Sequence, residues 1–182
     1  MNKVLDFKEF VPKNVKHALN KIGDNKIISA RLARTPVQEI IQDVLKTVSN
    51  IDDNLFHLFI ELTLDNGKKW ILEKNERINL VKDRSDKQTE FTEMFSVNKT
   101  VNELFENTKN KMGEKFLPYQ SANNNCQFFI MGVLDGNGLN TPERTEFVKQ
   151  DTKNIFTPEL RKVANTLTDI GGYGNAIIQL FD

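Results

Sequence analysis

The order of the predicted elements indicates an α+β protein in which a small antiparallel sheet or meander packs against a helix. Helical segments come first, a β-hairpin follows near the middle of the chain, and further helices come after it. Strands and helices that alternated one by one would instead predict a parallel sheet. The 182 residues are enough for one domain of ordinary size.

The first fifty residues are predicted to form an N-terminal helical extension. A short helix over Asn14–Ile22 is expected to end at Gly23. A clearer helix is expected to begin at Thr35-Pro36, because Thr is a good N-cap and Pro suits the first helical position. Its apolar residues, from Val37 to Val48, recur at helical spacing.

A β-hairpin is predicted at the centre of the chain. Leu55–Leu64 alternates imperfectly, Asp65-Asn66-Gly67 is a strong tight-turn signal, and Lys68–Leu72 returns as a strand. The second arm is expected to run on to Val81. The charged segment Lys82–Glu93 is expected to be a solvated loop.

Capping signals predict the remaining helices. A helix over Val101–Met112 is expected to end at Gly113, and a buried helix is expected to begin near Cys126. Thr141-Pro142-Glu143 and Thr157-Pro158-Glu159 are near-identical helix starts. The predicted organisation is an N-terminal helical extension over 1–50, a core over 51–140, and C-terminal helices over 141–182 packed on the same domain.

Composition argues against several classes of function. The formal net charge is zero and no basic cluster is interleaved with aromatic residues, so nucleic acid is not an expected partner. A single cysteine rules out an internal disulfide framework and a thiolate zinc site, and neither a metal nor a cofactor is expected. The N-terminus lacks the apolar run of a signal peptide, and no stretch approaches the roughly 18 apolar residues of a membrane span. A cytoplasmic or virion-associated protein is therefore expected, and abundant Asn and Lys with little Ala fit an AT-rich genome such as many viruses have.

Cys126 has the most informative setting in the chain. Asn123-Asn124-Asn125 precede it and an apolar run from Phe128 to Leu134 follows, a pattern typical of a capped helix start. The positive end of a helix dipole favours the thiolate, which is the nucleophilic form. His57 opens the upstream strand, so a nucleophile–base pair is a hypothesis for these two residues. Across proteins, a lone cysteine ahead of an apolar helix is mostly a buried small residue.

The motifs around these residues resemble those of circularly permuted papain-like proteins, in which the histidine precedes the cysteine. His57-Leu58-Phe59 is similar to the histidine strand of that group. Tyr119 followed by Asn125-Cys126-Gln127-Phe128-Phe129 is similar to its Asn-Cys-x-x-Phe block. The group includes the lecithin:retinol acyltransferase family, permuted NlpC-type proteins of bacteria and large DNA viruses, and the desumoylating isopeptidases. The resemblance covers roughly residues 51–134 and implies a permuted papain-like fold.

The resemblance also implies a role for each residue of the site. Cys126 would attack a carbonyl, and His57 would take the thiol proton and later deliver it to the leaving group. The backbone N–H of Cys126 would stabilise the oxyanion together with a nearby donor, for which Gln127 and Gln120 are candidates.

A third polar residue should orient the imidazole, and the hairpin turn determines which one. A three-residue turn places Asn75 directly across from His57 and Glu73 one step along on the same face. Glu73 ranks first and Asn75 second, because the related acyltransferases use the diagonal position. A two-residue turn would place Glu76 opposite His57.

The expected activity is that of a thiol hydrolase or acyltransferase that forms an acyl-enzyme on an amide, ester or thioester. A peptide, an isopeptide or a lipid ester is the expected substrate. Gln127-Phe128 stands where the retinoid acyltransferases have Glu-His, which argues against retinoid acyl transfer. The alternative is a non-catalytic binding module, or a virion structural module that retains the papain-like fold and assembles into a larger particle.

Overall fold

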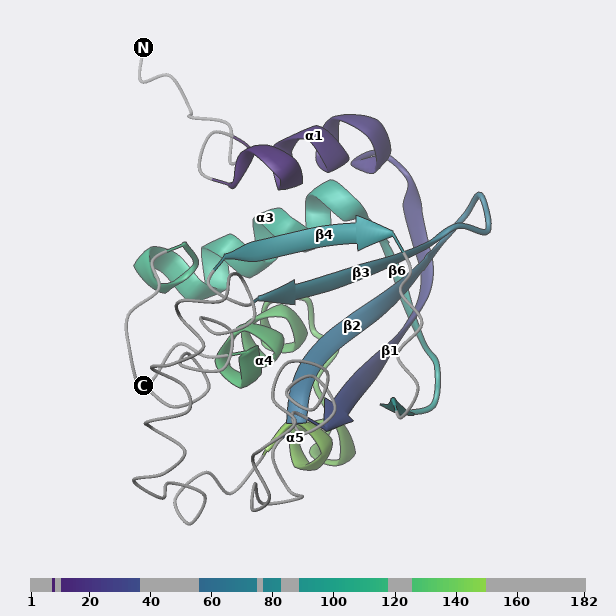
Figure 1. Cartoon of the computed structure of the whole chain (residues 1–182), viewed down its shortest axis with the longest axis vertical. Helices are drawn as coiled ribbons and strands as arrows, with labels where there is room; N and C mark the ends of the chain where they lie inside the picture. The colour runs from purple at the N-terminus through teal and green to yellow at the C-terminus, as the bar shows by residue number, and fades with distance from the viewer. Residues whose placement is uncertain are drawn as a thin grey trace, which may run out of the picture.

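An antiparallel sheet with helices packed against one face makes up the described part of the chain (Figure 1). A computed structural model describes residues 8, 11–36, 56–74, 77–82, 89–117 and 126–149. The elements, in chain order, are α1 (Lys13–Ile22), β1 (Lys26–Pro36), β2 (Phe56–Leu64), β3 (Lys69–Lys74), β4 (Ile78–Lys82), β5 (Glu90–Phe91), β6 (Phe95–Thr100), α3 (Val101–Met112), the 3-10 turn η2 (Gly113–Lys115), α4 (Cys126–Gly136) and α5 (Pro142–Val148). The α+β prediction is confirmed.

The strand β1 lies inside the sheet, which contradicts the prediction that residues 1–50 form a helical extension. The strand order is β4-β3-β2-β1-β5, and β6 also pairs with β1. Thr35 and Pro36, predicted to begin a helix, instead end β1, where they pair with His57 and Phe56. The helix predicted to follow them, over Val37–Val48, lies outside the described residues.

Tertiary partners explain why β1 is a strand despite its charged residues. Arg31 makes a bidentate ion pair with Glu61 of β2, at 2.9 and 3.0 Å. Arg34 pairs with Glu90 of β5 at 2.6 Å. A register shift between Ile27 and Ser29 also interrupts the two-residue alternation that marks a strand in a sequence.

The predicted hairpin of β2 and β3 is confirmed. Leu64 N–H donates to the Lys68 carbonyl at 2.9 Å, and Phe59 pairs with Glu73, so the turn has the three-residue form. The second arm is shorter than expected, since β3 ends at Lys74 and β4 returns antiparallel to it. Part of the expected loop over Lys82–Glu93 is also ordered into a sheet, because Glu90 and Phe91 form β5 against β1.

Side-chain caps mark the starts of α3 and α5. Thr100 and Glu103 form a capping box at the start of α3, which runs over the predicted residues to Gly113. α4 covers Cys126–Gly136, and Thr141 caps α5 by accepting from the N–H of Arg144. The helix predicted from Thr157-Pro158-Glu159 lies outside the described residues.

Alternation along the strands divides the buried residues between the two faces of the sheet. Leu58, Ile60 and Leu62 of β2 join the main core together with residues of α1, α3 and α4. Phe59, which lies between Leu58 and Ile60, points to the other face of the sheet. There it forms a small second cluster with Ala33 and Ile71. The start of β2 and the end of β3 thus carry side chains on both faces close to the first turn of α4.

Candidate active site

His57 lies at one end of the β2–β3 pair. Because β3 ends at Lys74, which is opposite Leu58 in the register, the imidazole stands just beyond the last pairing position of that strand. Its ring stacks on Phe59 with centroids 6.3 Å apart, and only 6 % of the residue is exposed. A titratable ring is therefore held in one place and shielded from water.

Glu73 binds the imidazole. His57 Nε2 and Glu73 Oε2 are 2.8 Å apart, and both side chains are buried. The three-residue turn accounts for this contact, since it pairs Glu73 with Phe59, two residues from His57 on the same face. A buried carboxylate is costly without a partner, so the pair supports a protonated imidazole.

Cys126 meets the same imidazole from the start of α4. Burial alone lowers the pKa of His57, but hydrogen bonds to Cys126 and Glu73 and the charges of both residues raise it to about 9. Cys126 is itself buried, at 4 % exposure. The thiol thus lies at the first residue of α4, beside a ring that carries a proton.

The structure thus brings together three of the predicted site residues, Cys126, His57 and Glu73. Gln127, predicted as an oxyanion donor, follows Cys126 in α4 and is half-buried. Asn75, Glu76 and Gln120 lie outside the described residues.

Lys74 was missed by the sequence analysis although it lies beside the site. Burial lowers its pKa to about 8. Strand alternation could have indicated its position, because Trp70 and Leu72 belong to the main core and Lys74 is the next residue on that face.

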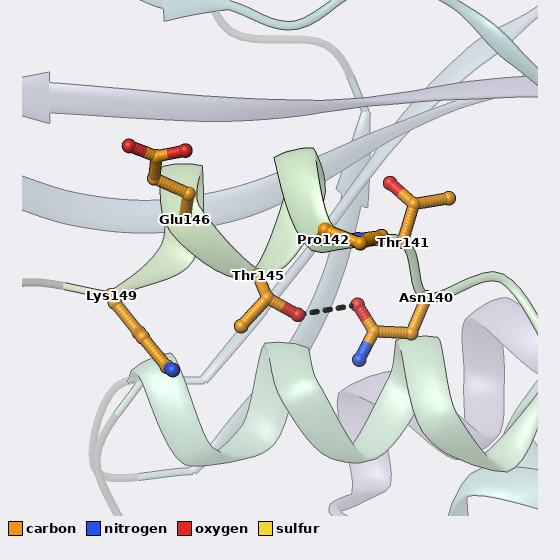
Figure 2. Close-up of a pocket in the computed structure, with 6 residues that line it drawn as sticks. All are labelled: Asn140, Thr141, Pro142, Thr145, Glu146 and Lys149. Carbon is orange, nitrogen blue, oxygen red and sulfur yellow. Dashed lines mark hydrogen bonds between the residues drawn. The ribbon is translucent and has the colours of Figure 1, made fainter.

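An open hollow elsewhere on the molecule contains none of the three residues. It has a volume of about 730 Å³ and lies along α5 (Figure 2). Across it the Thr145 hydroxyl donates to Asn140 Oδ1 at 2.9 Å. The lining residues are Asn140, Thr141, Pro142, Thr145, Glu146 and Lys149.

The described residues include no group of three or more His, Cys, Asp or Glu side chains placed to hold a metal ion. None of their helices combines the length and apolar character needed to cross a membrane.

Comparison with known proteins assigns no relative to the chain. No protein-family model matches it, and neither a curated protein nor a solved structure does.

Proposed function

We propose that this protein is a thiol hydrolase or acyltransferase of the permuted papain-like type, with Cys126 as nucleophile and His57 as base. One observation carries the proposal: the buried imidazole lies between a thiol at a helix start and a buried carboxylate. Nucleophile, base and orienting acid in this order form the arrangement that activates a thiol.

The reaction would proceed through a thioester. The Cys126 thiolate attacks the carbonyl carbon of an amide, ester or thioester, and the resulting oxyanion accepts from the backbone N–H of Cys126. The imidazolium of His57 donates its proton to the leaving group as that bond breaks. Water or an acceptor nucleophile then attacks the acyl-enzyme and gives its proton to His57, and the Cys126 thiolate leaves, which restores the thiolate and the imidazolium.

Each partner of the imidazole has a separate task in this scheme. With Nε2 bound to Glu73, Nδ1 is the ring nitrogen left to exchange a proton with the thiol. The carboxylate holds the ring in that orientation and stabilises the imidazolium. A peptide, an isopeptide or a lipid ester is the proposed substrate, and the cytoplasm or a virion is the proposed location.

Alkylation of the thiol tests the proposal directly, because Cys126 is the single cysteine of the chain. We expect iodoacetamide to modify the natural protein rapidly at about pH 6.5, where a free thiol of pKa about 8.5 is one-hundredth ionised. The His57→Ala variant should react about 100-fold more slowly at that pH, since its thiol loses the imidazolium.

The chain offers a matched control in its second histidine, His17, which is exposed on α1. His17→Ala should react like the natural protein. Equal rates for the natural protein and His57→Ala would overturn the catalytic proposal and favour a non-catalytic module that binds a partner or a particle. If the pair reacts as expected, mass spectrometry of Cys126 after incubation with esters, thioesters and isopeptides identifies the acyl donor.

A further inference from the structure

Lys74 occupies a position at which an apolar side chain would be expected. It is the last residue of β3 on the face that Trp70 and Leu72 turn towards the main core. Only 1 % of it is exposed, although a buried amine loses hydration that an apolar side chain of similar volume would not. A function that needs this amine would account for its burial.

The contacts of Lys74 connect β3 to the two segments on either side of residues 118–125. Nζ donates to the backbone carbonyl of Phe116 at 3.2 Å, at the end of η2. Nζ also lies 5.9 Å from the centroid of the Phe129 ring, in the first turn of α4. The rings of Phe116 and Phe129 pack together, with centroids 6.4 Å apart.

These contacts place Lys74 between the two halves of the candidate site. Glu73, its neighbour in β3, binds His57, and Phe129 lies one helical turn from Cys126. The buried side chain of Lys74 thus reaches from the strand that bears the carboxylate to the helix that bears the thiol. Phe116, which Lys74 binds, is 1 % exposed and has little freedom to move on its own.

We infer that Lys74 is a positioning residue: its amine holds Phe116 and the first turn of α4 against the end of β3, and so keeps the Cys126 thiol within reach of His57. This inference rests on the proposed function for its catalytic meaning. The hydrogen bond serves in both protonation states of Lys74, because a neutral amine still has N–H groups to donate. Positioning therefore persists on both sides of the pKa of about 8.

The test replaces Lys74 by methionine, which has a similar length and no N–H donor. We expect Lys74→Met to unfold cooperatively, because the lost hydrogen bond and the removed cost of burying an amine act in opposite directions. Its Cys126 should nevertheless alkylate about 10- to 100-fold more slowly at neutral pH, as for a misplaced catalytic group. The NMR titration midpoint of the His57 ring should fall from about 9, because the imidazole loses its contact with the thiol. Lys82→Met, which removes an exposed cation from β4, should change neither quantity.

Where the natural thiol is reactive, an unchanged alkylation rate or an unchanged His57 titration in a folded Lys74→Met protein would overturn the inference. If Lys74→Met does not fold, Lys74→Gln takes its place, since its shorter amide should give an intermediate loss of rate. Amide hydrogen exchange distinguishes a failure of the positioning role of Lys74 from a failure of the proposed function. If Lys74 positions α4, the amides of Phe116 and Phe129 exchange faster in the variant even where the natural thiol proves unreactive, and equal exchange rates would show that Lys74 holds nothing in place.

Discussion

The charge of the His57 imidazole depends on its two side-chain partners, Cys126 and Glu73. A neutral amide in place of Glu73 would orient the ring, whereas a carboxylate 2.8 Å away also stabilises the proton on it. Since burial opposes that proton, the raised pKa of His57, about 9, depends on its hydrogen bonds with Cys126 and Glu73. The imidazolium is therefore the resting form of the ring at neutral pH.

This charge state predicts how the stability of the fold depends on pH. The pKa of His57 is about 9 in the folded protein and about 6.5 in an unfolded chain. Its stabilising contribution is therefore fully present below about pH 6.5 and is lost as the pH rises through about 9. We expect Glu73→Gln to lower the free energy of unfolding by about 2 kcal/mol near pH 6 and by less near pH 10.

Urea unfolding of both proteins across this pH range measures the effect. Glu106→Gln, on the exposed side of α3, provides the matched control and should leave the curve unchanged. Parallel curves for the natural protein and Glu73→Gln would show that the imidazole does not depend on this carboxylate.

Local sequence signals predicted the hairpin and the helix that carry His57, Glu73 and Cys126, and the resemblance to permuted papain-like proteins predicted that the three residues meet. A turn signal fixed the hairpin register, and an asparagine run before an apolar segment marked the helix start. Lys74 could not be assigned in the same way, because its partner is the carbonyl of Phe116, which becomes a neighbour only in the folded chain.

Among the elements, β1 shows most clearly where local patterns are insufficient. Arg31 and Arg34 make its sequence look exposed, yet each meets a carboxylate on a neighbouring strand. The Arg31 guanidinium also lies 3.7 Å from the centroid of the Phe91 ring. Pairing of this kind depends on residues far along the chain, so no local window of the sequence contains it.

The α3–α4 contact is built around a buried amide. Asn137 Nδ2 donates to the Val133 and Leu104 carbonyls at 2.9 and 3.2 Å, and its Oδ1 accepts from Asn107 at 3.1 Å. Close to it, Gly136 leaves room for the backbone of α3, since a Cβ there would lie 2.8 Å from the Asn107 carbonyl oxygen. This network holds the helix that begins with Cys126.

We expect Asn137→Ala to destabilise the fold by about 2–3 kcal/mol, because it removes the buried hydrogen bonds to the Val133 and Leu104 carbonyls and the one accepted from Asn107. Asn140→Ala removes an exposed asparagine that binds Asp135 and should cost about 0.5 kcal/mol or less. Thermal unfolding followed by circular dichroism compares the two variants. Equal losses would mean that the buried amide network does not determine how α4 packs.

For the molecule as a whole, the N-terminal strand is part of the core that supports the site. β1 joins β2 on one side to β5 and β6 on the other, and its Thr35 pairs with His57. A protein that lacked this strand would present β2 as an open edge. The segment predicted to be an extension is therefore needed for the sheet.

Two alanine substitutions in β1 test this integration. Leu32 is fully buried, so Leu32→Ala should lower the free energy of unfolding by about 2–5 kcal/mol. Ile28 belongs to the same strand but is 49 % exposed, so Ile28→Ala should cost about 0.5 kcal/mol or less. Chemical denaturation of both variants gives the comparison, and similar small losses would place β1 outside the cooperative core.

The hairpin that carries His57 and Glu73 closes through a short turn, whereas Cys126 reaches them only when α4 packs onto the sheet. Glu73 and His57 are thus only 16 residues apart in the sequence, whereas the nucleophile Cys126 comes from a distant part of the chain. A partly folded chain with this hairpin formed but α4 undocked would have a proton acceptor and no activated thiol beside it. Under the proposed function, the reactivity of the thiol reports completed tertiary assembly rather than the formation of secondary structure.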